Sequence, residues 1–157
     1  MTDGWNADKD DLHCYVIAMA NGGWYGTSEE WRRREAPLVA IDPVLENFAA
    51  AHGLRLSKNH KETPERSIAW GNNPRCLIQI YLEDETDLLW NLWLCCSEDR
   101  ADSRYWRKDF AVNGEPMGAF EERLPRLLEN AFDRIEEWRA SPDQLEFATK
   151  LAPLPRG

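Results

Sequence analysis

The first long segment with a helical pattern of hydrophobic and polar residues carries clear start and stop signals. Thr27 and Glu30 have the spacing of a capping box, in which each side chain satisfies a free backbone amide at a helix start. Pro37 should interrupt this helix, and a second helix should begin with Asp42 as its N-cap. Gly53 should end that second helix.

Between residues 54 and 111 the hydrophobic residues recur at every second position, which is the period of a strand. Turn-rich pieces divide this stretch into segments with short connections. Neighbouring strands should therefore be antiparallel, because parallel neighbours need a long crossover. The predicted strands are 54–59, 66–70, 75–83, 88–96 and 104–110.

A helical pattern returns at 117–139, after residues 113–116. Its apolar residues form one wide stripe. Pro125 should kink this helix or mark its true start. Another helix is predicted at 141–151, with Ser141 as its cap. The stripe consists of Phe120, Leu124, Leu127, Leu128, Ala131, Ile135 and Trp138.

Together these elements predict an α+β fold in a single domain, 1–157, because strands and helices are kept apart along the chain. One antiparallel meander of about five strands, 54–111, should carry the N-terminal and C-terminal helices mainly on one face. Residues 1–11 are predicted to be a flexible tail, and 152–157 a non-helical tail. The apolar run at 12–20 fits a strand or a helix, and its residue types favour the strand.

Alternation in the two central strands separates a core face from an outer face. In 75–83, one set of alternate residues is entirely apolar. In 88–96, the set that contains Asn91 would cost about 1–3 kcal/mol in the core unless the amide found partners, so the other set should face inward. The register of 66–70 stays open. The predicted core face is Cys76, Ile78, Ile80, Leu82, Trp90, Leu92, Leu94 and Cys96.

The same alternation in 104–110 directs Trp106 and Phe110 inward, with Lys108 as an inward exception near the strand end. The outer face then comprises Leu77, Gln79, Tyr81, Leu89, Asn91, Trp93, Cys95, Tyr105, Arg107 and Asp109. Aromatic rings, amides and an arginine are residue types that anchor protein interfaces. The alternative is that residues 12–20 or the first helices cover this face. The residues predicted to bind a partner are Gln79, Tyr81, Asn91, Trp93, Tyr105 and Arg107.

Charge narrows the range of partners. The chain has 28 acidic and 19 basic residues and a net charge of -9. This balance disfavours nucleic acid, because binding to phosphate backbones needs Lys and Arg, and it suits a basic protein partner. No apolar run approaches the roughly 20 residues that cross a bilayer, and the acidic N-terminus does not resemble a signal peptide. We therefore expect a cytoplasmic protein that binds neither nucleic acid nor membranes.

The cysteines are expected to be reduced thiols, as is usual in the cytoplasm. Cys95 and Cys96 are adjacent in a strand and face opposite ways, so they cannot share a metal ion. Cys76 can lie opposite Cys96, and we expect that pair to be reduced as well. The acidic turns at 83–87 and 98–102, like the three histidines, lack the spacing of a metal site or a catalytic motif. We predict no cofactor and no metal, and this pattern favours a protein that is not an enzyme.

These observations predict a small, acidic, tryptophan-rich module that binds one protein partner through its outer sheet face. In size and acidity the chain resembles, as a class, small bacterial immunity proteins and secretion chaperones, which bind one partner and carry no chemistry. The resemblance rests on no motif and transfers no residues. One alternative is a small-molecule binder or enzyme with a tryptophan-lined pocket between sheet and helices, to which His52 or Lys108 would contribute. Another is a homodimer that buries the outer face.

Overall fold

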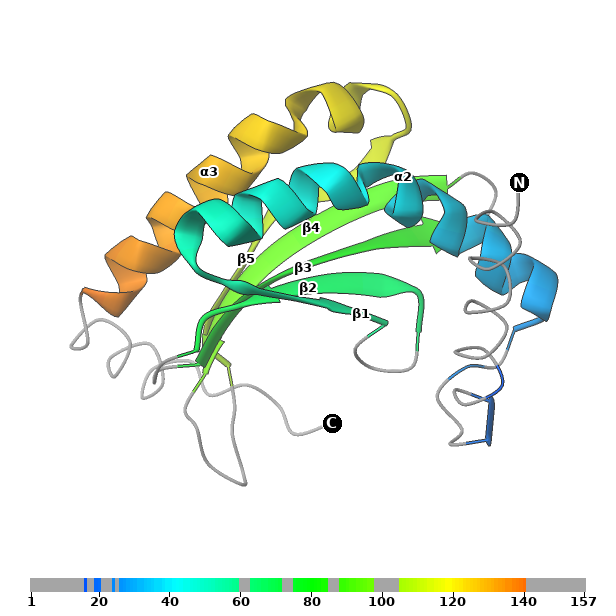
Figure 1. The fold of residues 1–157 in the computed structure, drawn as a ribbon, viewed down its shortest axis with the longest axis horizontal. Coiled ribbons are helices and arrows are strands. Elements are labelled where there is room, and N and C mark those ends of the chain that lie inside the picture. Colours follow the sequence, from blue (N-terminus) through cyan, green and yellow to red (C-terminus); the bar gives the residue numbers. More distant parts are fainter. Residues whose placement is uncertain are drawn as a thin grey trace.

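Five antiparallel strands and two helices make up the described part of the chain. The computed structural model describes residues 16, 19, 20, 24, 26–59, 63–71, 75–84, 88–97 and 105–140. The elements are α2 (Ser28–His52), β1 (Arg55–Lys58), β2 (Glu65–Ala69), β3 (Arg75–Asp84), β4 (Leu88–Ser97), β5 (Tyr105–Pro116) and α3 (Ala119–Arg139). The sheet order is β1-β2-β3-β4-β5, and both helices lie on one face of the sheet (Figure 1). The predicted α+β fold with a meander sheet is confirmed.

Helix α2 is one continuous helix where the sequence predicted two. The hydroxyl of Thr27 accepts a hydrogen bond of 3.1 Å from the amide of the third helical residue, and Gly53 ends the helix in the left-handed conformation. These two predicted caps are confirmed. Pro37 and Pro43 both lie inside the helix. The predicted interruption at Pro37 and the predicted N-cap at Asp42 are therefore wrong.

A buried ion-pair network explains why α2 continues through its prolines. Arg66 of β2 is 1% exposed; its Nε donates to Asp42 at 2.8 Å and its Nη1 to Glu35 at 2.9 Å. The two carboxylates are seven residues apart, about two helical turns, so an unbroken helix places both above Arg66. Burial by itself lowers the pKa of Arg66, but the hydrogen bond and the charges of both carboxylates raise it above its ordinary value. These charge-assisted bonds offset the backbone hydrogen bonds lost at the prolines.

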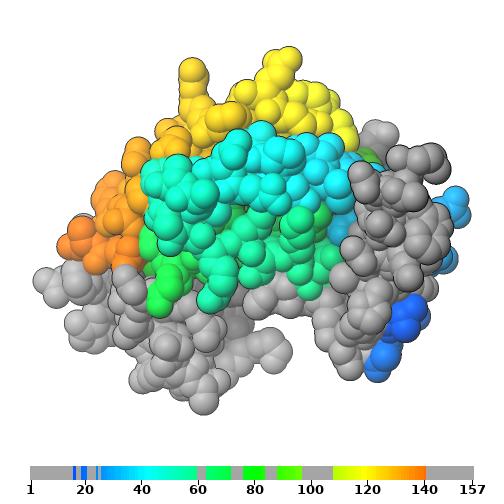
Figure 2. All heavy atoms as spheres, viewed as in Figure 1, coloured from blue at the N-terminus to red at the C-terminus, as the bar shows by residue number. Residues whose placement is uncertain are grey.

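The core fills the space between the helices and one face of the sheet. Every residue of the predicted α3 stripe is buried, and every predicted core residue of β3 and β4 is at most 3% exposed. The ring of Trp90 stacks on that of Phe120, with centroids 4.5 Å apart. In the space-filling view the atoms of α2 lie directly against those of α3 (Figure 2). The predicted core face is confirmed. Pro125 lies inside α3 and does not mark its start.

Strand β5 is longer and less regular than the sequence predicted. It continues to Pro116, whereas the predicted strand ended at residue 110. Its pairing with β4 has three register shifts, and Gly114 beside one of them has a φ of 81°. Each shift inserts an extra residue into β5 and changes which residues share a face. Simple alternation therefore fails along this strand, and Val112 takes the core position opposite Leu92.

Three described side chains of β5, those of Lys108, Asp109 and Phe110, consequently face the opposite way from the prediction. Phe110 pairs with Trp93 on the outer face and is 42% exposed, and Lys108 lies over the Trp93 ring. Both were predicted to point inward, which is wrong. Asp109, predicted to point outward, binds Arg134 of α3 at 2.6 Å. The side chain of Trp106 lies outside the described part.

Most of the predicted elements at the two ends of the chain lie outside the described residues. The tail at 1–11, the helix at 141–151 and the tail at 152–157 lie outside the described residues. The described residues of the run at 12–20 are helical, so the preference for a strand is wrong there.

Neither described helix combines the length and apolarity that a membrane-spanning segment needs.

Candidate functional site

The outer face of the sheet, opposite α2 and α3, is polar and largely buried at its centre. Gln79 is 4% exposed, Asn91 is 0% exposed and Trp93 is 9% exposed. Tyr81 is only half-buried. The centre of the face is therefore covered, while the ring of Tyr81 remains accessible.

Strand register brings four of the predicted partner-binding residues together. Gln79 lies opposite Trp93, and Tyr81 lies opposite Asn91. On the other side of β3, Tyr81 is paired with Glu65 of β2. Directly opposed residues on one face are within contact distance, so these five side chains form one polar and aromatic group. Sequence reasoning missed Glu65, because it was placed in a turn-rich piece just before the strand predicted at 66–70, whereas β2 begins at Glu65.

The other two predicted residues, Tyr105 and Arg107, belong to β5. Their backbones pair with Ser97 and Cys96. Cys96 is a core-face position, so the register separates Arg107 from the group around Tyr81. The side chains of both residues lie outside the described part, and their role in a site stays a prediction.

A hollow of about 340 Å³ lies beside this group. Its volume is near the lower end of the roughly 300–1,000 Å³ found for small-ligand sites, and it has room for a protruding side chain of a partner. We call it the outer hollow. In the view of Figure 1, the first turns of α2, which supply one of its walls, extend past the sheet. The outer hollow is lined by Trp24, Arg34, Thr63, Pro64, Glu65, Gln79, Tyr81, Leu82 and Trp93.

Glu65 is the carboxylate of the outer hollow, and it is only 6% exposed. Its Oε2 accepts a hydrogen bond from the amide of Gln79 at 2.5 Å, and its Oε1 accepts one from the hydroxyl of Thr63 at 2.9 Å. Both donors are neutral. Within the described part of the chain, no lysine or arginine pairs with this carboxylate. Glu65 is thus a buried negative charge held in a fixed orientation.

The hydroxyl of Tyr81 lies in negatively charged surroundings. Burial raises the pKa of Tyr81, and the charges of Glu83 and Glu65 raise it further. All three effects act in the same direction, because each disfavours the phenolate. The hydroxyl therefore stays protonated at neutral pH and can donate a hydrogen bond.

Two cations of the chain lie over tryptophan rings of the outer hollow. Nζ of Lys108 is 3.8 Å from the centroid of the Trp93 ring, and the guanidinium carbon of Arg34 is 5.2 Å from that of Trp24. Both distances lie within the range of cation–π attraction. Nε of Arg34 is buried and has no hydrogen-bond partner among the described residues. Sequence reasoning missed Trp24 and Arg34, because only the fold brings the start of α2 close to β3 and β4.

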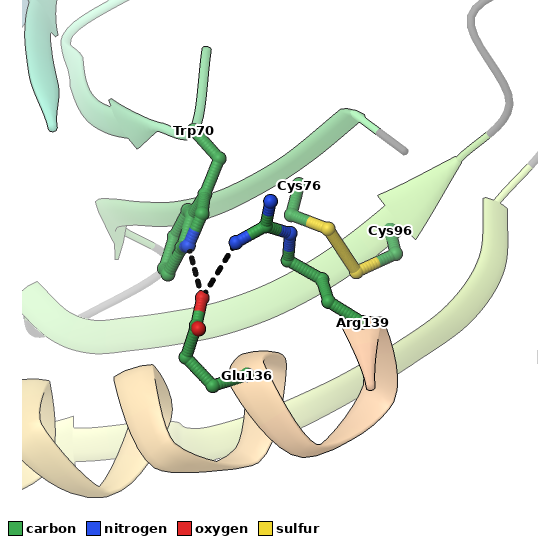
Figure 3. Close-up of a disulfide and its surroundings, with 5 residues drawn as sticks. All are labelled: Trp70, Cys76, Cys96, Glu136 and Arg139. Carbon is green, nitrogen blue, oxygen red and sulfur yellow. Dashed lines mark hydrogen bonds and ion pairs between the residues drawn. A yellow bond between two sulfur atoms is a disulfide. The ribbon is translucent and has the colours of Figure 1, made fainter. Parts of the chain in front are cut away.

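Cys76 and Cys96 form a second feature, on the core face rather than at the outer hollow. Cys76 lies opposite Cys96 as predicted, but the two form a disulfide with Cα atoms 4.2 Å apart (Figure 3). The expected reduced state is wrong for this pair, because directly opposed residues on antiparallel strands bring their sulfur atoms within bonding reach. Beside the disulfide, Trp70 and Arg139 both donate to Glu136, each at 2.7 Å (Figure 3).

Among the described residues, no group of three His, Cys, Asp or Glu side chains is placed to hold a metal ion. A second hollow of about 420 Å³ lies at the start of β4. It is lined by Arg33, Leu88, Leu89, Pro116 and Met117, none of which was predicted as a site residue.

No protein-family model matches the chain, and neither a curated protein nor a solved structure matches it.

Proposed function

We propose that the protein is a small acidic binding module without enzymatic activity, which holds one protein partner at the outer hollow. The observation that carries this proposal is the 340 Å³ hollow lined by Gln79, Tyr81 and Trp93, three residues that the sequence predicted to meet a partner. Large rings with polar edges beside an amide are typical anchors of protein interfaces. The half-exposed ring of Tyr81 lies where a partner can reach it.

Burial of the walls supports the same proposal. Trp93 is 9% exposed and Gln79, bonded to Glu65, is 4% exposed, so the surrounding structure restrains both side chains. A preformed site binds more tightly than a mobile one, because less conformational entropy is lost on association. The outer hollow is therefore suited to receive a side chain that protrudes from the partner.

Charge and composition supply the rest of the proposal. The net charge of -9 favours a basic protein and disfavours nucleic acid. The cytoplasmic location stays a proposal. The disulfide counts against it, because disulfides are rare in that compartment.

Replacing Tyr81 tests the proposal most directly. Tyr81→Ala should weaken binding of the partner at least about tenfold, the loss typical of an interface anchor. The partner is identified by affinity capture from the native cell, and the Kd is then measured with the purified proteins. Leu77→Ala is the matched control, because Leu77 is also half-buried on the outer face of β3 but does not line the hollow. Equal affinity of Tyr81→Ala and wild type, with unchanged circular dichroism, would contradict the proposal.

A small-molecule ligand is the second candidate, and the volume of the outer hollow favours it. The predicted pocket between sheet and helices is less well supported, because Trp90 and Phe120 fill part of that space. Of the polar groups expected there, Lys108 lies on the outer face and His52 binds Glu129 at 3.0 Å. A metabolite that raises the Tm of wild type but not of Tyr81→Ala would favour this candidate.

The other alternative, a homodimer that buries the outer face, is tested by measuring the molar mass of the protein in solution by light scattering.

A further inference from the structure

The buried carboxylate of Glu65 in the outer hollow has only neutral hydrogen-bond donors among the described residues. The carboxylate of Glu65 is 6% exposed and accepts only from the neutral groups of Gln79 and Thr63 within the described residues. Buried charges in proteins are usually paired with an opposite charge, because neutral donors offset only part of the lost hydration. A cation beside Glu65 would supply that pairing.

We propose that the outer hollow takes a lysine or arginine side chain from a basic segment of the partner protein. In this arrangement Glu65 is the counter-ion, and the rings of Tyr81 and Trp93 form the walls around the aliphatic stem and the charged group. The inference rests on the proposed function and names the chemistry of its partner.

The surroundings of Tyr81 support a cation. Burial raises the pKa of Tyr81, and the carboxylates of Glu83 and Glu65 raise it further, so its hydroxyl lies in a negative potential. Glu83 is exposed at the surface. It adds to the net charge of -9 that attracts a basic segment from a distance.

The chain itself supplies an example of the contact. The ammonium group of Lys108 lies 3.8 Å from the centroid of the Trp93 ring. Lys108 is exposed and belongs to β5, the last strand of the sheet. The Trp93 ring therefore already holds a lysine of the chain within the range of cation–π attraction.

Arg34 is the feature that would favour the opposite ligand. It lines the outer hollow, and no group in the described part of the chain forms a hydrogen bond with its Nε. Two observations favour the cation. The guanidinium of Arg34 lies over the ring of Trp24 and is half-buried, whereas the carboxylate of Glu65 is almost fully buried. An anionic ligand would also approach a chain whose net charge is -9. Binding of an anion is accordingly an outcome of the test.

The test uses the full chain and three synthetic peptides of identical length: one rich in lysine, the same peptide with every lysine acetylated, and one rich in glutamate. Binding is measured by calorimetry, and the bound position by NMR signals of Tyr81 and Trp93. The lysine peptide should shift both signals, and acetylation should weaken its binding at least tenfold. This comparison needs no protein variant, so it holds even where a substitution unfolds the chain.

A pair of variants separates local recognition from general attraction by an acidic protein. Glu65→Gln and Glu122→Gln each remove one negative charge, but Glu122 is exposed on α3, on the other side of the sheet. Glu65→Gln should weaken binding of the lysine peptide at least tenfold, and Glu122→Gln less than twofold. Equal effects of the two variants would overturn the inference, since the attraction would then be nonspecific.

The remaining outcomes distinguish this inference from the proposed function. If the acetylated peptide bound as tightly as the lysine peptide, the proposed recognition of a cation would be overturned. If instead the glutamate peptide bound, and Arg34→Gln abolished that binding, the ligand of the outer hollow would be an anion. A captured partner that requires Tyr81, in a chain that gives no response to the lysine peptide, would overturn the inference alone. A captured partner that is indifferent to Tyr81→Ala would overturn the proposed function as well.

Discussion

At the scale of the residue, Tyr81 joins the two sides of the outer hollow. Its strand neighbours are Glu65 on β2 and Asn91 on β4. Its ring is half-buried, so burial weakens the hydration of a phenolate, and the nearby charges of Glu83 and Glu65 repel one. The protonation of Tyr81 therefore reports on the electrostatic potential in the hollow.

The pKa of Tyr81 should lie above the ordinary tyrosine value of about 10, and Glu65→Gln should lower it toward that value. Because the folded state holds the proton more tightly than the unfolded state, the resulting stability is present below about pH 10 and is lost as the pH rises through the folded pKa. NMR titration of the Tyr81 ring carbon Cζ measures the pKa, with Glu122→Gln as a control. A pKa at or below 10 would contradict this prediction.

Asn91 shows how polarity decided the orientation of a strand. Its amide lies on the outer face, as we predicted from the free-energy cost of placing an amide in the apolar core. It is nevertheless 0% exposed. Its Oδ1 accepts a hydrogen bond from the backbone amide of Gly114 at 3.2 Å, while its Nδ2 has no partner within the described ranges. The register shift of β5 next to Asn91 brings that amide within reach. One hydrogen bond thus meets part of the desolvation cost.

At the scale of the element, α2 is stabilised by contacts with β2 as well as by its own caps. Two prolines lie inside the helix, and each removes a backbone hydrogen bond. Arg66 binds both Glu35 and Asp42, while Lys58 of β1 lies 3.3 Å from Asp42. The helix and the first two strands are therefore held together by charge as well as by the apolar core.

Asp42→Asn should destabilise the protein by roughly 3 kcal/mol, because it leaves the buried guanidinium of Arg66 short of one counter-ion. Urea denaturation monitored by circular dichroism measures the loss. Glu46→Gln is the control, since Glu46 is exposed and its nitrogen–oxygen distance to Lys58 is 3.8 Å. That variant should change stability by less than about 1 kcal/mol. Equal losses in both variants would show that burial of the network contributes nothing.

At the scale of the whole molecule, the disulfide links the two central strands beneath the helices. Cys76 of β3 and Cys96 of β4 are 20 residues apart in sequence, and both are fully buried in the core. The bond closes the central hairpin and limits the conformations of the unfolded chain, which raises the relative stability of the fold.

Reduction should therefore lower the free energy of unfolding by about 3 kcal/mol. A thermal melt of wild type with and without a reducing agent, accompanied by mass spectrometry of alkylated thiols, measures this effect. The double variant Cys76→Ala/Cys96→Ala should melt near reduced wild type and should be insensitive to the reductant. Identical melts of oxidised and reduced wild type would refute the contribution of the disulfide.

Features that depend on neighbouring residues were determined by the sequence alone. The caps at Thr27 and Gly53, the buried stripe of α3 and the core faces of β3 and β4 all follow from spacing over a few residues. The meander follows from the same information, because short connections leave only antiparallel neighbours. At the candidate site, alternation correctly placed Gln79, Tyr81, Asn91 and Trp93 on one face.

Tertiary structure decided everything that requires distant parts of the chain to meet. Asp42, predicted to be a helix cap, instead binds Arg66 in a buried network. The register shifts of β5 place Phe110 on the outer face. Wrapping of the chain joins Trp24 and Arg34 to the outer hollow beside Glu65. Local patterns record which residues avoid water, because that preference is a property of each side chain. They do not predict which pairs of charged groups, aromatic rings or sulfur atoms come into contact, because those contacts depend on the register and packing of the folded chain.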